Sequence, residues 1–356
     1  MIPTGSKIGN RYVVESLIGQ GGMQDVYKAK DLLLDRYVAL KTPQAGQKIR
    51  RFRDSAVISA RINHHNVAKT YDLLDDEFTP FLIEEFVEGE TLDEAIIGKA
   101  RYLDPFLAST IFLNLAKGTA ASHNVGVIHR DLKPSNVLVS GGFNLTNVKI
   151  TDFGIATLTE AVIEEVRATT DLTRSSSKTI QGALPYMAPE MMFRKVGEYP
   201  DQKLDVWSIG AMMFRLLTDQ YAFGEGFEAV ANVKMGARTP WPSFMTTNPQ
   251  FSVYAEALQR LVETCLQQNP DLRPSAQELA ISCEDLVSFA GERYTGIIDR
   301  HLTISTGIIR AGTGEQVFFH RDSIYGTKTI IPGTKVSFCA SPGSPFRRAH
   351  PITVIN

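Results

Sequence analysis

The 356-residue chain is predicted to be an α+β protein with a strand-rich start, a helical centre and a small all-β barrel at its end. Residues 11–41 alternate apolar runs with glycine-containing turns, which favours short strands. Residues 104–125 carry apolar side chains at helical spacing, and helical signals continue to about residue 289. From residue 291 onward, short alternating runs separated by turn clusters are typical of a small barrel.

Composition and charge indicate an ordinary soluble globular protein. The net charge is −2, but residues 291–356 contain eight Lys and Arg against four Asp and Glu, so this end carries about +4. Three scattered cysteines show no metal-ligand spacing and suit a reducing compartment. We find no signal-peptide pattern and no apolar run of membrane-spanning length, so we expect a cytoplasmic protein with no membrane partner.

The most informative segment is Val127–Val139, in which two apolar runs enclose a polar core from His129 to Asn136. The core supplies a carboxylate at Asp131, a cation at Lys133 and an amide at Asn136. This set fits phosphoryl transfer, because the carboxylate can accept a hydroxyl proton, the cation can neutralise a phosphoryl group and the amide oxygen can hold a metal. A polar loop with a chance sequence is the alternative, but H-R-D-L-x-x-x-N is a protein kinase signature.

Residues 10–288 accordingly resemble the serine/threonine protein kinase family. The glycine-rich segment 18–29 precedes Val38-Ala-Leu-Lys41, and Asp152-Phe-Gly follows the H-R-D segment by about twenty residues. The resemblance implies a two-lobed kinase fold, with a small β-rich N-lobe at about 10–87 and a larger helical C-lobe at about 88–288.

The resemblance also implies ATP and Mg²⁺ as cofactors. Lys41 would bind the α- and β-phosphates, the backbone of residues 85–87 would meet the adenine, and Asn136 and Asp152 would hold the metal. The residues expected around ATP are Ile18, Gly19, Gly21, Val26, Ala39, Lys41, Glu84, Glu85, Val87, Leu138 and Asp152. Asp205 is expected to tie down the catalytic loop, and Arg273 to pair with Glu190.

Several positions depart from the family pattern. Gln24 replaces the third glycine, which predicts a bulkier and stiffer loop tip, and Ala183 replaces a threonine of the substrate-docking segment. Ser55 occupies the site of the helix glutamate that pairs with the strand lysine, and the adjacent Asp54 points about 100° away around the helix.

Glu84 is unexpectedly charged for the back of an ATP pocket. We hypothesise that Glu84 supplies the counter-charge for Lys41. Two alternatives stay open: the strand register could differ by one, leaving Glu84 in solvent, or Lys41 could bind Asp152 in an inactive state.

Residues 155–185 form a polar segment rich in Thr and Ser, which predicts a mobile regulatory loop. A phosphate there could bind Arg130, next to the catalytic aspartate. The expected phosphorylation sites are Thr169, Thr170, Thr173, Ser175, Ser176, Ser177 and Thr179.

Residues 295–356 resemble a cold-shock domain, an OB-fold module, through segments 317–324 and 331–338. Strand alternation places Phe318 and His320 on the outer face as a stacking platform for single-stranded nucleic acid. The neighbouring strand offers no aromatic residue, so binding is expected to be weak. The alternative is that the barrel docks on the kinase or on a protein partner.

The function that these features predict is transfer of the ATP γ-phosphoryl group to Ser or Thr hydroxyls of proteins, including those of the regulatory loop. Lys133 favours serine/threonine over tyrosine specificity, as the family pattern implies. The alternative is a nucleotide-binding pseudokinase that acts as a scaffold or sensor. The departures at Gln24, Ser55 and Ala183 favour that alternative.

Overall fold

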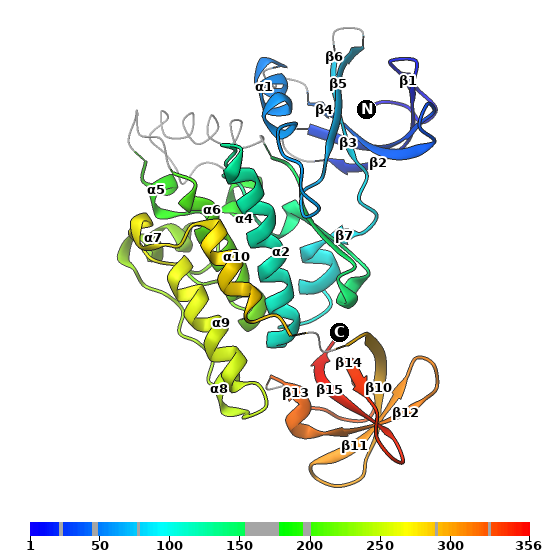
Figure 1. Ribbon diagram of the computed structural model, residues 1–356, viewed down its shortest axis with the longest axis vertical. Helices are drawn as coiled ribbons and strands as arrows, with labels where there is room; N and C mark the ends of the chain where they lie inside the picture. Colours follow the sequence, from blue (N-terminus) through cyan, green and yellow to red (C-terminus); the bar gives the residue numbers. More distant parts are fainter. Residues whose placement is uncertain are drawn as a thin grey trace.

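The protein has a strand-rich N-lobe, a helical C-lobe and a separate C-terminal barrel that lies at the far end of the C-lobe from the N-lobe (Figure 1). The computed structural model describes residues 1–20, 24–44, 49–76, 79–153, 178–194, 201–288, 291–326 and 329–356.

The N-lobe is built on a six-stranded antiparallel sheet in the order β1-β2-β3-β4-β6-β5. Alternating strand residues such as Tyr12, Tyr27, Val38 and Ile83 are buried on one side and form the core of this lobe. The strands are β1 (Lys7–Ile8), β2 (Tyr12–Gln20), β3 (Gln24–Asp31), β4 (Arg36–Pro43), β5 (Thr70–Asp76) and β6 (Thr79–Glu85).

One helix, α1 (Ile49–Ser59), packs on this sheet. Phe52 and Ala56, which are four residues apart and therefore share a helix face, form a small apolar cluster with Leu82 of β6. The helix that the sequence placed around Ser55 is thus present.

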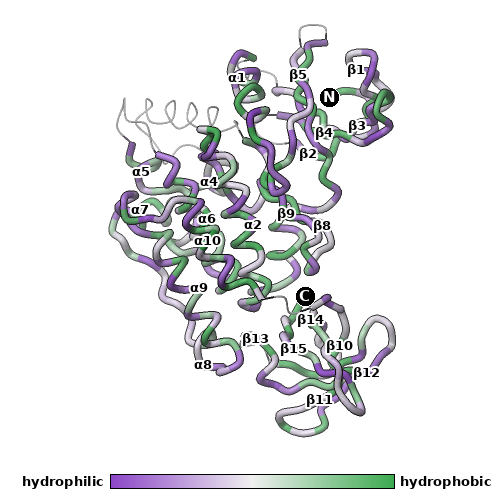
Figure 2. Tube along the Cα trace, viewed as in Figure 1, coloured by the Kyte–Doolittle hydropathy of each residue, from purple (hydrophilic) through white to green (hydrophobic). Residues whose placement is uncertain are grey.

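The C-lobe is organised around α2 (Pro105–Asn124) and α6 (Lys203–Thr218), which carry the long hydrophobic runs visible in Figure 2. Helix α2 begins with Pro105 after Asp104, whose carboxylate accepts a hydrogen bond from the Leu107 N–H as an N-cap. The other helices of the lobe are α4 (Lys178–Ala183), α5 (Pro189–Met192), α7 (Phe227–Met235), α8 (Phe244–Thr247), α9 (Ser252–Cys265) and α10 (Ala276–Glu284).

A small three-stranded sheet, in the order β7-β8-β9, lies between the two lobes. Its strands are β7 (Glu90–Thr91), β8 (Val137–Ser140) and β9 (Asn147–Ile150). The loop that joins α2 to β8 contains Asp131, Lys133 and Asn136, so β8 and β9 position both this loop and Asp152, which follows β9.

The C-terminal unit is a closed β-barrel, because β12 pairs with both β11 and β15 and thereby closes the ring β12-β11-β10-β14-β15. Inward-facing residues such as Ile298, Val317, Phe319 and Phe338 fill it. Its strands are β10 (Arg293–His301), β11 (Thr306–Ala311), β12 (Gln316–His320), β13 (Ile324–Tyr325), β14 (Lys335–Ser341) and β15 (Arg347–Val354). The short strands expected after residue 291 are thus present, together with the two-residue strand β13.

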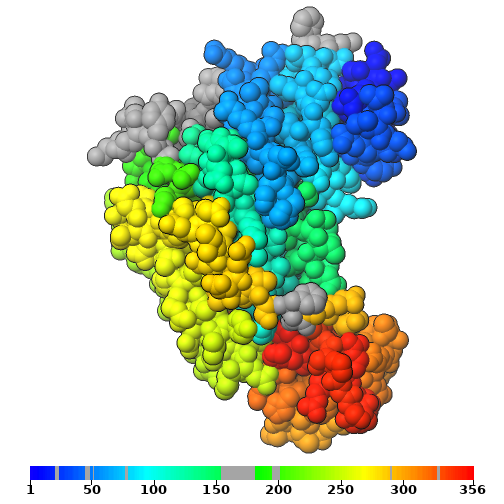
Figure 3. Space-filling view, viewed as in Figure 1, coloured from blue at the N-terminus to red at the C-terminus, as the bar shows by residue number. Residues whose placement is uncertain are grey.

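The barrel packs directly against the lower end of the C-lobe (Figure 3). Tyr325 of β13 belongs to the hydrophobic core of the C-lobe, where its ring contacts Tyr102, Phe244 and Phe251. Gly326 lies so close to Tyr102 that an added Cβ atom would be 1.9 Å from the ring, so no larger residue fits there without a shift.

A buried ion pair also joins the two units. Both carboxylate oxygens of Asp104 accept hydrogen bonds from Nη2 of Arg293 in β10, at 2.9 and 2.7 Å. Thr353 of β15 donates to the same carboxylate at 2.6 Å. Asn144 of the C-lobe adds two hydrogen bonds to the backbone of Arg293. The N-cap of the central helix is therefore also the anchor of the barrel.

None of the helices in the described part of the chain is long and apolar enough to cross a membrane.

Candidate active site

The loop that carries Asp131, Lys133 and Asn136 is held by a buried carboxylate, that of Asp205. Asp205, near the start of α6, accepts hydrogen bonds from the backbone N–H groups of His129 and Arg130, both at 2.8 Å. Burial alone would raise the pKa of Asp205, but hydrogen bonding to His123 and to this backbone holds it below its ordinary value. Arg130 is kept at a positive φ of 66°, which is uncommon for a non-glycine residue. The expected role of Asp205 as an anchor is confirmed.

His129 connects this loop to the strand that precedes Asp152. Its Nε2 donates to the carbonyl oxygen of Thr151 at 2.8 Å, while its Nδ1 accepts from the backbone N–H of Asp131 at 3.3 Å. Thr151 also donates through its backbone N–H to the carbonyl of Asn136. The loop and the segment carrying Asp152 are therefore fixed relative to each other.

Asp131, Lys133 and Asn136 lie together, as the sequence predicted. Lys133 Nζ is 2.8 Å from Asp131 Oδ2, and the Asn136 amide donates to the same oxygen at 3.2 Å and to the Asp131 carbonyl at 2.7 Å. The short 3-10 turn Pro134–Asn136 brings the amide back to the aspartate. One carboxylate is thus oriented by a cation and an amide, as a positioned proton acceptor requires.

A pocket of about 340 Å³ lies between the lobes beside this loop. Every described residue that we expected around ATP lines it; Gly21 lies outside the described residues. The lining side chains of β2, β3 and β4 form its roof, and Leu138 of β8 forms part of its floor. Additional lining residues that the sequence did not single out are Ala68, Gly89, Glu90, Thr91, Glu94, Ser135 and Thr151.

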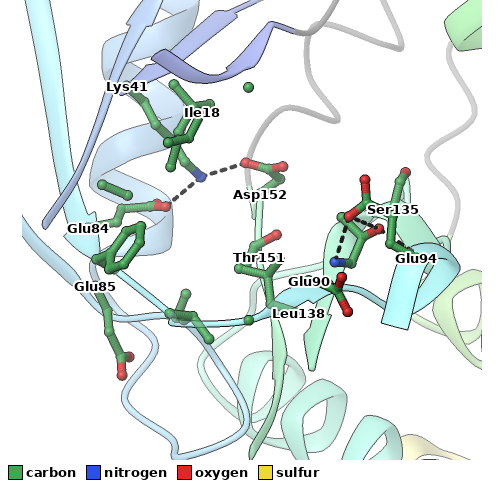
Figure 4. Close-up of a pocket in the computed structure, with 18 residues that line it drawn as sticks. Ile18, Lys41, Glu84, Glu85, Glu90, Glu94, Ser135, Leu138, Thr151 and Asp152 are labelled. Carbon is green, nitrogen blue, oxygen red and sulfur yellow. Dashed lines mark hydrogen bonds and ion pairs between the residues drawn. The ribbon is translucent and has the colours of Figure 1, made fainter. Parts of the chain in front are cut away.

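At the back of the pocket, Lys41 lies between two carboxylates (Figure 4). Its Nζ is 2.5 Å from Glu84 Oε2 and 2.5 Å from Asp152 Oδ1. Burial alone would lower the pKa of Lys41, but the two carboxylates outweigh it and raise the pKa above its ordinary value. Burial raises the pKa of Glu84, and Lys41 opposes that rise.

The structure confirms that Glu84 and Lys41 form an ion pair, as hypothesised. The alternative in which Glu84 faces solvent is wrong, because the residue is only 4% exposed. The contact between Lys41 and Asp152, which we associated with an inactive state, is present at the same time.

Gln24 corrects one expectation. It is not part of the loop tip, but begins β3 with a buried side chain whose amide donates to Asp152 Oδ1 at 3.0 Å. Val26, two residues along the same strand, lines the pocket. Because side chains alternate along a strand, the position of Val26 was a signal that Gln24 also points into the site.

The other two residues that depart from the family pattern, Ser55 and Ala183, lie where the motif matches placed them. Ser55 is buried in α1 and its hydroxyl donates to the Phe52 carbonyl, whereas the Asp54 side chain is 64% exposed. Ala183 is buried at the end of α4. Arg273 forms the expected bidentate pair with Glu190, at 2.6 and 2.9 Å.

Six of the seven expected phosphorylation sites fall outside the part of the chain that the structure describes. The sites from Thr169 to Ser177 lie outside the described residues, and Thr179 falls in the first turn of α4. Arg130, which would receive a phosphate, lies at the catalytic loop.

On the barrel, side chains along β12 alternate between buried and partly exposed, as the sequence predicted. Val317 and Phe319 are 1% exposed and fill the interior, whereas Phe318 and His320 are partly exposed. The His320 side chain is 43% exposed and its Nδ1 accepts a hydrogen bond from the Asp322 backbone. The neighbouring Ile308 is fully buried and therefore offers no exposed surface for stacking.

These observations define a two-lobed fold with a pocket between the lobes and, at the edge of the pocket, a polar loop that carries Asp131, Lys133 and Asn136. A family model described as the protein kinase domain matches residues 12–282. The chain belongs to the protein kinase family.

Comparison with curated proteins finds serine/threonine-protein kinases that match across this domain. The kinase PrkC of Bacillus subtilis is 34% identical over 242 residues, covering 66% of this chain and 35% of PrkC. PknL of Mycobacterium bovis is 32% identical over 294 residues, covering 77% of this chain and 68% of PknL. A probable kinase PknB of Lactococcus lactis is 32% identical over 345 residues, covering 95% of this chain and 48% of PknB. The chain thus spans between about a third and two thirds of the length of these relatives.

Proposed function

We propose that the protein is a serine/threonine kinase that transfers the γ-phosphoryl group of ATP to hydroxyl groups of proteins. The observation that carries this proposal is the contact of Asp131 with Lys133 and Asn136 beside a pocket that also contains Lys41 and Asp152. The names of the relatives, which are serine/threonine kinases, support the same specificity as Lys133.

In this proposal Asp131 orients the attacking hydroxyl and accepts its proton. Lys133, already in contact with Asp131, neutralises charge on the phosphoryl group as it moves. Lys41 binds the ATP phosphates, and the backbone of residues 85–87 binds the adenine edge. The pocket volume of about 340 Å³ is within the range of small-molecule sites.

The donor set fits Mg²⁺, a hard cation that prefers oxygen ligands and is usually held by one or two protein groups together with substrate phosphates. Asn136 uses its amide N–H₂ to bind Asp131, which leaves its side-chain oxygen for a metal. Asp152 supplies a carboxylate. Bound Mg²⁺ would neutralise charge on the phosphates, and we propose Asn136 and Asp152 as its protein ligands.

A nucleotide-binding pseudokinase, acting as a scaffold or sensor, is the second candidate. One observation favours it: Asp152 Oδ1 receives both Lys41 and Gln24, so protein groups occupy an oxygen of the proposed metal ligand. Against it, the residues proposed as base, as metal ligands and as phosphate-binding lysine are all present in the chain. The two candidates differ in whether phosphate is transferred.

We further propose that activity depends on phosphorylation between Thr169 and Thr179, including phosphorylation by the kinase itself. A phosphate adds about −1.5 to −2 charge at pH 7 and forms strong hydrogen bonds with arginine. Arg130 adjoins the catalytic aspartate and is the proposed receptor.

For the domain organisation we propose a kinase domain at residues 10–288 and an OB-type, cold-shock-like barrel at residues 295–356. Phe318 and His320 on its outer face support weak binding of single-stranded nucleic acid. Intramolecular ion pairs of Arg300 and Arg310 with Asp299 neutralise part of its positive charge, which fits weak binding. Packing against the C-lobe supports the docking role instead.

The proposed function is tested by incubating the full chain with radiolabelled ATP and Mg²⁺ and locating the phosphate by mass spectrometry. We expect phosphoserine or phosphothreonine within residues 169–179, dependence on Mg²⁺, and a large loss of activity when all seven hydroxyl residues there are replaced by alanine. Absence of transfer both to the chain itself and to an added protein substrate would favour the pseudokinase. Undiminished activity of the alanine variant would refute the proposed regulation.

A further inference from the structure

The charge balance around Lys41 differs from that expected of a kinase pocket. Lys41 is 6% exposed, and a buried ammonium group needs a carboxylate that stays in place. One of its two partners, Asp152, is the proposed metal ligand, so its carboxylate has a second task when nucleotide is bound. Glu84 has no such second task, because it lies at the back of the pocket on β6.

Helix α1 does not supply this carboxylate within the described residues. Asp54 is exposed and lies 4.0 Å from Arg50 of the same helix. Ser55, at the inward-facing position, cannot carry a charge and donates its hydroxyl to its own helix. The described ion pairs of Lys41 are with Glu84 and Asp152 alone.

The sheet register explains how Glu84 reaches Lys41. In the β4–β6 ladder Ala39 is opposite Glu84 and Lys41 is opposite Leu82, so Lys41 and Glu84 are diagonal neighbours. Side chains of diagonal neighbours on one face are within reach when they are long. Hydrogen bonds of one sheet therefore fix this pair, whereas a pair with a helix residue would depend on the position of the helix.

We infer that Glu84 is the positioning residue that orients Lys41 towards nucleotide phosphates, in place of an acid on α1. This inference rests on the proposed nucleotide site. Asp152 can then leave Lys41 for a metal while Glu84 keeps the ammonium group in place. Nucleotide binding accordingly does not require any side chain of α1 to enter the pocket.

The test measures the affinity of the full chain for ADP with Mg²⁺ by isothermal titration calorimetry. Glu84→Gln keeps the shape of the side chain and removes its charge, and we expect the dissociation constant to rise roughly tenfold or more, because one partner of a buried pair is lost. The matched controls on α1, Asp54→Asn and Ser55→Ala, should stay within about twofold of the wild type. Glu84→Met, which removes a buried charge and fills similar space, is a second variant with the same expected loss.

A double-mutant cycle separates positioning from a general structural effect. In a Lys41→Met background, Glu84→Gln should cause little further loss of ADP affinity, because both changes remove the same interaction. Thermal unfolding of each variant verifies that it is folded.

Either of two results would overturn the inference. In the first, folded Glu84→Gln and Glu84→Met proteins bind ADP as tightly as the wild type. In the second, Glu84→Gln lowers ADP affinity by the same factor in the wild-type and Lys41→Met backgrounds. ADP binding does not need phosphoryl transfer, so a pseudokinase would still give the expected losses. A wild-type chain that binds no nucleotide would overturn both this inference and the proposed function.

Discussion

At the residue scale, the least expected contact is that of Gln24 with Asp152. The Gln24 amide and Lys41 both donate to Asp152 Oδ1, at 3.0 and 2.5 Å. Burial would raise the pKa of Asp152, but these donors keep it below its ordinary value, so the carboxylate stays ionised. If Asp152 holds Mg²⁺ as proposed, Gln24 would compete with the metal ion for this oxygen.

Replacing Gln24 by alanine should ease metal binding. A hydrogen bond to a charged group contributes about 1.5–3 kcal/mol, so its removal should lower the Mg²⁺ concentration that gives half-maximal activity by about tenfold or more. Activity measured over a range of Mg²⁺ concentrations at saturating ATP provides the test. Gln44→Ala is a suitable control, because Gln44 donates to Asp25 and not to Asp152. An unchanged or higher Mg²⁺ requirement would show that Gln24 does not restrain Asp152.

At the element scale, β12 carries the proposed nucleic-acid platform. Phe318→Ala combined with His320→Ala should weaken binding of labelled single-stranded DNA or RNA by at least about tenfold, because stacking contributes about 1–3 kcal/mol per base. Fluorescence anisotropy at low and high salt measures this, and binding should weaken as salt rises. Ile331→Ala, an exposed apolar position outside β12, is the control.

Undetectable binding at low salt, or binding that the double variant leaves unchanged, would contradict the platform. The docking role of the barrel would then be the better account.

Strand alternation explains which parts of these elements could be predicted. It places Phe318 and His320 outside the barrel and therefore Val317 and Phe319 inside it, and these placements hold in the structure, whereas the position of Glu84 in the pocket followed from the kinase resemblance. The same rule would have placed Gln24 in the pocket, but the family pattern drew attention to its loop position instead. The two-residue strand β13 was missed because an element that short has no period to detect.

At the scale of the whole molecule, the kinase and the barrel form one packed unit (Figure 3). The sequence left docking of the barrel on the kinase as an alternative but could not specify the contact, because Asp104 and Arg293 are separated by 189 residues and neither belongs to a motif. Polar contacts between distant segments leave no periodic signal, and Asp104 alone indicates only a helix N-cap. The position of the barrel therefore required the structure.

Asp104→Ala should destabilise the protein strongly. It removes the N-cap of α2 and leaves Arg293 buried without its partner, at a cost of about 3–5 kcal/mol. Urea unfolding followed by fluorescence measures the loss, and Glu256→Ala, an exposed acid on α9, should change the free energy of unfolding by less than about 0.5 kcal/mol. Combining Asp104→Ala with Arg293→Met should cost less than the sum of the two single changes. Full additivity would mean that the ion pair does not couple the two units.

The central claim is that the chain is a catalytically active protein kinase with Asp131 as its base. The most direct measurement compares the rate of radiolabelled phosphate transfer from ATP by wild-type protein with that by Asp131→Asn, which keeps the side-chain shape and removes its basicity. We expect Asp131→Asn to lower the rate at least about a hundredfold while ADP affinity and thermal stability remain close to those of the wild type. Transfer by folded Asp131→Asn at the wild-type rate, or no transfer by the wild type, would contradict the account.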